Sequence, residues 1–162
     1  MISVDLIVEL PTSHGYDALL VVVDRLSKRV HVIPTTSDIN SVGVAQLFQD
    51  HIWRHYGLSE EIISGHGTQF VSQFMMRAQQ TPRDQDHTAS TAYHPQTDGQ
   101  AECINQEIEQ YLRLFVKQRQ ENWYEWVSLA EFTYNNQIHS STQMTPFMLD
   151  NGQQPRLGVE PV

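Results

Sequence analysis

The chain has 162 residues, a mass of 18.7 kDa and a hydrophobic fraction of 40%, which suits one domain with a single core. Ten Lys and Arg against nineteen Asp and Glu give a net charge of −9, so any contact with nucleic acid must rest on a local patch or on missing domains. No stretch approaches the roughly 20 apolar residues of a membrane span, and the sequence does not start with the basic segment typical of a signal peptide. The single cysteine, Cys103, excludes an internal disulfide and a cysteine-rich zinc module. We therefore expect no membrane association.

We predict one domain over residues 1–150, followed by a short tail containing Gly and Pro over residues 151–162. Weak alternation predicts a first strand over residues 2–10. The Val- and Leu-rich run over residues 18–24 is typical of a central, buried strand. A third strand is predicted over residues 30–33, ending at Pro34 because proline cannot donate to a strand ladder.

The middle and the end of the chain carry helical patterns. Apolar residues at helical spacing predict a helix over residues 41–56, which Gly57 would end. A short strand is expected over residues 60–64, and the longest helix is expected to start near a capping box formed by Thr97 and Gln100. A further helix is predicted over residues 123–135. Strands first and mixed elements afterwards indicate an α/β domain built on a mixed sheet.

Three acidic residues lie at positions where chemistry could occur. Asp5 interrupts the first apolar strand, and acids inside apolar strands are rare unless they are paired or coordinate an ion. Glu102 falls on the first turn of the long helix, where a carboxylate also has the ordinary role of stabilising the helix dipole. Asp24 follows the second strand and is expected to flank a turn. Position alone leaves catalytic and structural roles open for Asp5 and Glu102.

Five blocks of sequence carry a resemblance when they are taken in chain order: VDLIVELP, GYDALLVVVDRLSKRVHVIPT, IISGHGTQFVSQF, STAYHPQTDGQAECINQEIEQYLR and WYEWVSLAEFTYNNQIHSSTQMTPF. Together, over roughly residues 2–156, they resemble the integrase catalytic core of Ty3/Gypsy-type LTR retrotransposons. The resemblance implies an RNase H-like fold with a central mixed five-stranded sheet flanked by helices. It also implies DNA integration in the nucleus, a homodimer formed through the long-helix region, and Mg²⁺ or Mn²⁺ as cofactor.

The chemistry of that family explains which residue types it needs. Attack on a phosphodiester requires an activated hydroxyl and a neutralised leaving oxygen, and two hard cations about 3.5–4 Å apart supply both. Because Mg²⁺ prefers oxygen ligands, the family holds its two ions with two Asp and one Glu on strand and helix ends.

Carried over residue by residue, the resemblance assigns catalytic and metal-binding roles to Asp5 and Glu102. The second metal-binding aspartate of the family pattern falls on Gly65, and His66 follows where the family has an arginine. Gly65 has no side-chain ligand, and neutral imidazole is a poor ligand for Mg²⁺. We therefore expect a degenerate core without strand transfer. One alternative is a module that binds nucleic acid or protein without catalysing a reaction. Another is residual nuclease activity with one metal, which would need Asp5, Glu102 and a substitute ligand.

Candidate DNA-binding residues are less specific. The resemblance points to the loop before Glu102 and to one face of the long helix; the residues are His94, Gln96, Gln100, Arg113 and Lys117. A solvated polar face with Glu/Arg pairs explains the helix residues more simply. The same alternatives hold for the basic turn formed by Arg25, Lys28 and Arg29.

Two further groups of side chains have candidate binding roles. His51 and His55, four residues apart on one helix, match a metal-binding spacing, although an ordinary helix surface explains them better. The aromatic residues of the last predicted helix are expected to pack in the core or in a dimer interface rather than to stack on bases; they are Trp123, Trp126, Phe132 and Tyr134.

Overall fold

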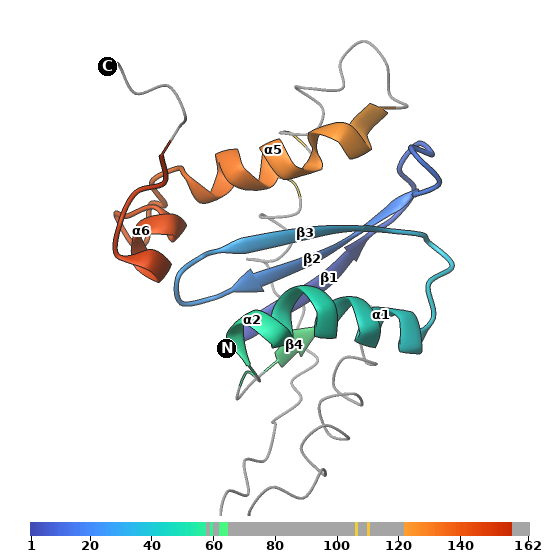
Figure 1. Cartoon of the computed structure of the whole chain (residues 1–162), viewed down its shortest axis with the longest axis horizontal. Coiled ribbons are helices and arrows are strands. Elements are labelled where there is room, and N and C mark those ends of the chain that lie inside the picture. Colours follow the sequence, from blue (N-terminus) through green and yellow to red (C-terminus); the bar gives the residue numbers. More distant parts are fainter. Residues whose placement is uncertain (58, 60–61, 65–105, 107–109, 111–121, 157–162) are drawn as a thin grey trace, which may run out of the picture.

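A computed structural model describes residues 1–57, 59, 62–64, 106, 110 and 122–156, and the following refers to them. Their four strands form one mixed sheet in the order β3-β2-β1-β4 (Figure 1). β1 pairs antiparallel with β2 and parallel with β4, and β2 pairs antiparallel with β3. The strands are β1 (Ile2–Ile7), β2 (Ala18–Asp24), β3 (Val30–Thr35) and β4 (Ile62–Ser64).

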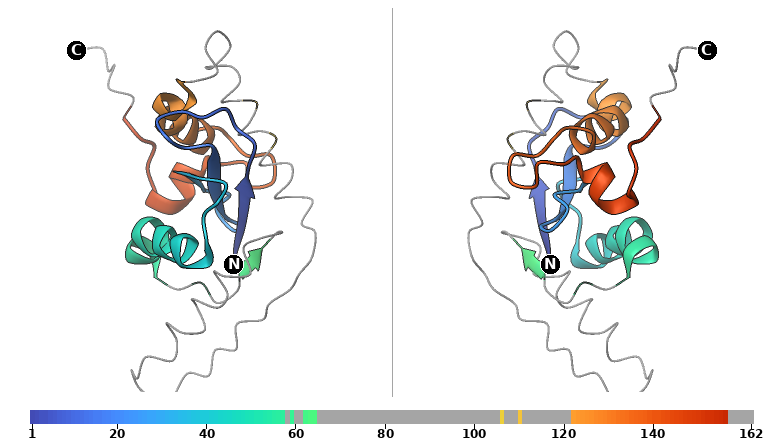
Figure 2. Two further views of the ribbon diagram at one scale, coloured as in Figure 1. Left: turned by 90° about the vertical axis from the view of Figure 1, so that its right-hand side faces the viewer. Right: turned by 90° about the vertical axis from the view of Figure 1, so that its left-hand side faces the viewer.

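Helices cover both faces of this sheet (Figure 2). One face packs against a continuous run formed by α1 (Ser41–Phe48), the π-helical turn η1 (Gln49–Trp53) and α2 (Arg54–Tyr56). The other face packs against α5 (Trp123–Asn135), after which the chain continues to the short helix α6 (Pro146–Asn151). Each face has its own cluster of buried apolar side chains, so the sheet is the shared middle layer of two cores.

These elements confirm the predicted α/β class and the mixed sheet. β2 has the predicted bounds, and six of its seven residues are buried, as its unbroken Val and Leu run requires when both faces are covered. The predicted bounds of α5 are confirmed as well. The described residues contain four strands, so a fifth strand stays a prediction.

Two predicted strand ends are wrong. β1 ends at Ile7 rather than at residue 10, and Glu9 has a φ of 65°, which interrupts an extended strand. β3 continues through Pro34 to Thr35, with Pro34 opposite Leu19. In an antiparallel edge strand alternate residues direct their backbone polar groups outward, as Val30 and Val32 do here. Pro34 lies two residues after Val32 and therefore also directs its backbone outward, so its lack of an N–H removes no hydrogen bond to β2.

The predicted helix over residues 41–56 is present but is not one regular α-helix. Asn40 caps its start by accepting the Gly43 N–H through its side chain, and Gly57 ends it with a φ of 75°, as expected. Between α1 and α2 the five residues of η1 form a π-helical turn. The sequence pattern could not indicate this turn, because one extra residue in a turn leaves the apolar spacing almost unchanged.

The outer edge of β3 is closed by two side chains of α5. The Asn135 amide accepts the Val30 N–H at 2.9 Å and donates to the Val30 carbonyl at 2.8 Å, as a neighbouring strand would. One turn earlier, Glu131 Oε2 accepts the Val32 N–H at 2.9 Å. Its other oxygen, Oε1, lies 3.3 Å from His31 Nδ1. These bonds satisfy an edge that would otherwise be open to pairing with another chain.

We expect Asn135→Ala to lower the free energy of unfolding by about 2–4 kcal/mol, because it leaves a buried N–H and a buried carbonyl of Val30 without partners. Urea unfolding followed by tryptophan fluorescence measures the change. Gln137→Ala, at an exposed position just after the helix, serves as the control. Equal stability of both variants would contradict the role given to Asn135.

Asp17 links two loops at the end of the sheet opposite the turn between β2 and β3. Its two carboxylate oxygens accept the Ser37 N–H at 2.6 Å and the Ser37 hydroxyl at 2.7 Å. These hydrogen bonds, that of the hydroxyl above all, hold the pKa of Asp17 below its ordinary value. The bonded carboxylate therefore links the loop before β2 to the loop after β3.

A carboxyl group whose pKa is lower in the folded than in the unfolded chain adds stability above its unfolded pKa and loses it as the pH falls. We expect Ser37→Ala to lower the denaturant midpoint near neutral pH, and the difference from the natural chain to shrink as the pH falls below the ordinary pKa of an aspartate. Denaturation at a series of pH values measures it. Ser128→Ala, at an exposed position of α5, provides the control. A pH-independent difference would show that the Asp17 charge is not involved.

Candidate metal and nucleic-acid site

Asp5 lies on β1, between β2 and β4 in the middle of the sheet. Its cross-strand partner is Val21, a member of the core cluster that includes α5, so Asp5 lies on the α5 face of the sheet. The side chain is partly buried, and its Oδ1 accepts the Leu6 N–H at 2.9 Å. That bond ties the carboxylate to its own strand.

The pairing of β4 with β1 determines which residues lie near Asp5. The parallel register pairs Ile2 with Ile62 and Val4 with Ser64. Asp5 follows Val4 in the sequence, and Gly65 follows Ser64. The two positions that the family pattern assigns to aspartates therefore come directly after a cross-strand pair. Gly65 itself lies outside the described residues.

Asp5 is the predicted site residue that the structure describes. The other candidates, Glu102 for catalysis and His94, Gln96, Gln100, Arg113 and Lys117 for DNA binding, lie outside the described residues. The structure therefore positions one carboxylate of the predicted site and the strand that leads to the substituted position.

Within the described part of the chain, no group of three or more His, Cys, Asp or Glu side chains could hold a metal ion. His51 and His55 are exposed, and His55 Nε2 accepts a hydrogen bond from Arg54 Nε at 2.9 Å. The ordinary helix-surface interpretation of this histidine pair therefore stands.

Other candidate residues have structural roles. The side chain of Asp24 accepts the N–H groups of Leu26 and Ser27 and the Ser27 hydroxyl, which confirms its turn-flanking role. Trp123 and Tyr134 are buried in the core as predicted, whereas Trp126 is 37% exposed.

None of the helices described by the structure is long and apolar enough to cross a membrane.

Comparison with known proteins identifies the relatives of this chain. No family model matches it. The Tf2-3 and Tf2-4 transposon polyproteins of Schizosaccharomyces pombe are each 39% identical to it over 162 residues, which is 96% of the chain and 12% of each polyprotein. The chain thus spans about an eighth of the length of these relatives.

Solved structures share the fold of this chain. The HTLV-2 integrase catalytic core domain, solved in complex with magnesium, has a TM-score of 0.62 and 18% identity, with 90% of this chain and 93% of that core covered. A chain of a simian T-cell lymphotropic virus intasome, solved in complex with PP2A regulatory subunit B56 gamma, has a TM-score of 0.68 and 20% identity. That match covers 99% of this chain and 57% of the other. This chain belongs to the integrase catalytic cores of Ty3/Gypsy-type retrotransposons.

The integrase fold explains the order of the strands in this chain. Its RNase H-like architecture is the one shared by the viral cores, with a mixed sheet covered by helices on both faces. At these identities the structural likeness concerns the fold, so the residues of the site must be judged from this integrase core's own sequence and geometry.

Sequence reasoning missed two residues that fix the sheet of the integrase core. Glu131 and Asn135 lie four residues apart on α5 and both bond to the outer edge of β3. The available signal was a polar residue on the apolar stripe of a helix, since Asn135 follows the periodicity of Val127, Ala130 and Tyr134.

We expect Asp5→Asn to change the free energy of unfolding of the integrase core by less than about 1 kcal/mol, because an amide oxygen can still accept the Leu6 N–H. Urea unfolding measures this, with the isosteric variant compared directly to the natural chain. A decrease of several kcal/mol would show that the charge of Asp5 maintains the fold and is not reserved for a ligand.

Proposed function

We propose that this chain is an integrase core that retains DNA as its partner and has lost metal-dependent strand transfer. The observation that supports this most strongly is the pairing of Val4 with Ser64, which are followed by Asp5 and by Gly65. An aspartate at position 65 would follow a strand hydrogen-bonded to the strand of Asp5. Glycine leaves that position without an oxygen ligand.

The absence of one carboxylate matters because the chemistry needs two cations. The proposed ligand set is reduced to Asp5 and Glu102, one fewer than two Asp and one Glu. Two divalent ions held close together repel each other, and shared carboxylates offset that repulsion. His66, next to Gly65, does not replace the missing charge, since imidazole is neutral and suits softer metals than Mg²⁺. The residues present therefore do not fit a metal pair.

The remaining function that we propose is binding. The viral cores with the same fold were solved as dimeric and trimeric forms, and one belongs to an intasome. By resemblance to them we propose that this core self-associates as a homodimer and binds DNA in the nucleus. A core without catalysis would then act as a nucleic-acid or protein binding module.

Calorimetric titration of Mg²⁺ and Mn²⁺ into the natural chain and into Gly65→Asp tests this proposal. We expect measurable binding for Gly65→Asp alone, because the substitution restores an oxygen ligand beside the strand of Asp5. Gly67→Asp, which adds the same charge two residues later, is the matched control and should bind no better than the natural chain.

Two results would contradict the proposal. Binding of two ions by the natural chain would mean that a substitute ligand exists. Binding by Gly67→Asp as tight as by Gly65→Asp would mean that added charge alone, and not the position of the ligand, determines affinity. Glu102→Gln in the Gly65→Asp background should remove the restored binding if Glu102 is a ligand.

A further inference from the structure

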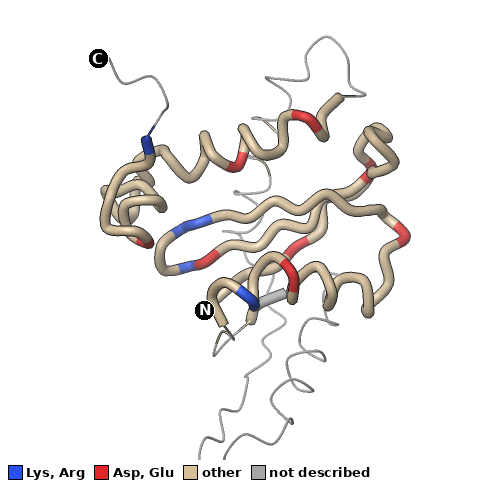
Figure 3. The backbone as a smooth tube through the Cα atoms, viewed as in Figure 1, with Lys and Arg blue, Asp and Glu red and all other residues tan. Residues whose placement is uncertain are grey.

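The described residues of this acidic protein separate their charges along the sheet (Figure 3). All Lys and Arg side chains of the described part lie on three segments: the turn between β2 and β3, α2, and the segment from α6 to residue 156. We call these segments the basic end; its cations are Arg25, Lys28, Arg29, Arg54 and Arg156.

Side-chain interactions between the three segments bring them together. Arg29 Nη1 lies 3.1 Å from Asp150 Oδ2 of α6, and its guanidinium lies over the Phe147 ring at 5.1 Å from the centroid. Tyr56 of α2 packs its ring 5.3 Å from that of His31, two residues after Arg29. Residues distant in the sequence thus form one surface.

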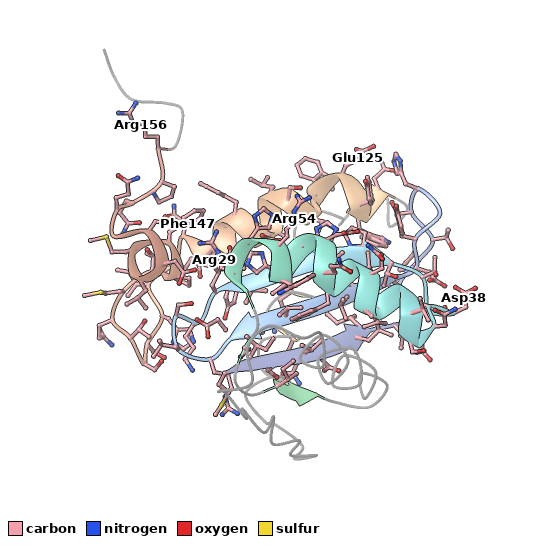
Figure 4. The ribbon with its side chains drawn as sticks, turned by 60° about the horizontal axis from the view of Figure 1, so that its bottom comes forward. Arg29, Asp38, Arg54, Glu125, Phe147 and Arg156 are labelled. Atoms are coloured by element: carbon pink, nitrogen blue, oxygen red, sulfur yellow. The ribbon has the colours of Figure 1, made fainter. Side chains whose placement is uncertain are left out.

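The opposite end of the sheet carries only acidic charges among the described Lys, Arg, Asp and Glu residues. Figure 4 shows Asp38 and Glu125 on the side away from Arg29 and Arg156. The acidic end consists of residues 8–17, residues 36–40 and the first turn of α5; its carboxylates are Glu9, Asp17, Asp38 and Glu125.

Formal charges make the contrast concrete. The three segments of the basic end have five cations against Asp24 and Asp150, which gives +3, and the adjacent carboxylates of Asp50 on η1 and Glu131 on α5 lower this to +1. The acidic end has four carboxylates and no Lys or Arg, which gives −4. A local cationic surface on a protein of net charge −9 is the kind of patch on which contact with nucleic acid has to rest.

The turn of the basic end is held in one shape. Asp24 accepts three hydrogen bonds from Leu26 and Ser27, and its carbonyl accepts the Lys28 N–H at 2.8 Å. Its carboxylate is thereby occupied by the turn itself. Lys28 has a φ of 64° and forms no ion pair within the described part of the chain. A rigid turn presents this cation without the entropy cost of ordering a loop on binding.

We propose that the basic end binds the phosphate backbone of DNA, with Lys28 and Arg54 touching phosphates. The proposal rests on the proposed function in taking DNA as the partner, but it requires no metal and no catalysis. Asp24 pairs with Ile2, and Asp5 is three residues further along β1, so the basic end lies about 10 Å along the strand from the candidate site. That length corresponds to about three phosphates of one strand.

The acidic end of a second copy of this chain is the competing partner, that is, the alternative to DNA as the partner of the basic end. Two of its carboxylates are already engaged, since Asp17 accepts two hydrogen bonds from Ser37 and Glu125 lies 3.4 Å from His14. Engaged carboxylates have less to gain from a new cation than the phosphates of a duplex, which carry a full charge every few ångströms. The charges therefore favour DNA.

The test is fluorescence anisotropy of a short labelled duplex with the full 162-residue chain, in EDTA and at several salt concentrations. We expect Lys28→Ala with Arg54→Ala to weaken binding and to reduce the salt slope by about 2, since each phosphate that is no longer neutralised lowers it by about 0.9. Thr12→Glu with Ser128→Glu lowers the net charge equally at exposed sites outside the basic end, and it should keep the natural slope.

The absence of DNA binding by the natural chain, an unchanged slope for the double alanine variant, or an equal reduction in the control would each overturn the proposal. Light scattering on the same samples separates the competing partner. If the double alanine variant lowers the molecular mass and leaves the DNA slope unchanged, the basic end binds a second copy instead. Because EDTA removes divalent ions, this result does not depend on the calorimetric test of position 65.

Discussion

The hydrogen bonds between α5 and the edge of β3 are the constraint on which the rest of this integrase core depends. Asn135 pairs with Val30 as a strand would, and Glu131 bonds to Val32 one turn earlier. They fix α5 against the sheet, close its open edge and align one of the two cores. The chain beyond α5 then reaches Arg29, where α6 is held by an ion pair and a cation–ring interaction. The closed edge of β3 and the basic end thus lie next to each other in the fold.

The same register leads inward to the candidate site. Val32 pairs with Val21, and Val21 pairs with Asp5, so the bond from Glu131 lies on the row of the sheet that carries the carboxylate. On its other side β1 pairs with β4, whose last residue precedes Gly65. The structure places Asp5 in this row and the strand that leads to position 65 beside it. In our proposal the missing part is one side chain, which explains how an intact fold and absent catalysis can occur together.

Much of the fold could be predicted because burial leaves a simple trace in the sequence. The Val and Leu run of β2 and the helical spacing of α5 predicted their observed bounds. Pro34 misled the prediction because its effect depends on which way its backbone points, which pairing decides. The edge bonds of Asn135 and the separation of charge between the two ends arise from segments distant in the sequence, so a linear pattern does not contain them. The candidate site followed from the family motif, and the structure adds the register around Asp5.

Glycine at position 65, in our proposal, removes a ligand and with it the metal pair. Electron paramagnetic resonance of Mn²⁺ counts bound ions directly, because protein-bound Mn²⁺ does not give the sharp signal of the free ion. With Mn²⁺ added in more than twofold molar excess over the natural chain, we expect the full signal of free Mn²⁺. With Gly65→Asp we expect a decrease in signal equivalent to about two ions for each site. A comparable decrease with the natural chain would contradict the proposal.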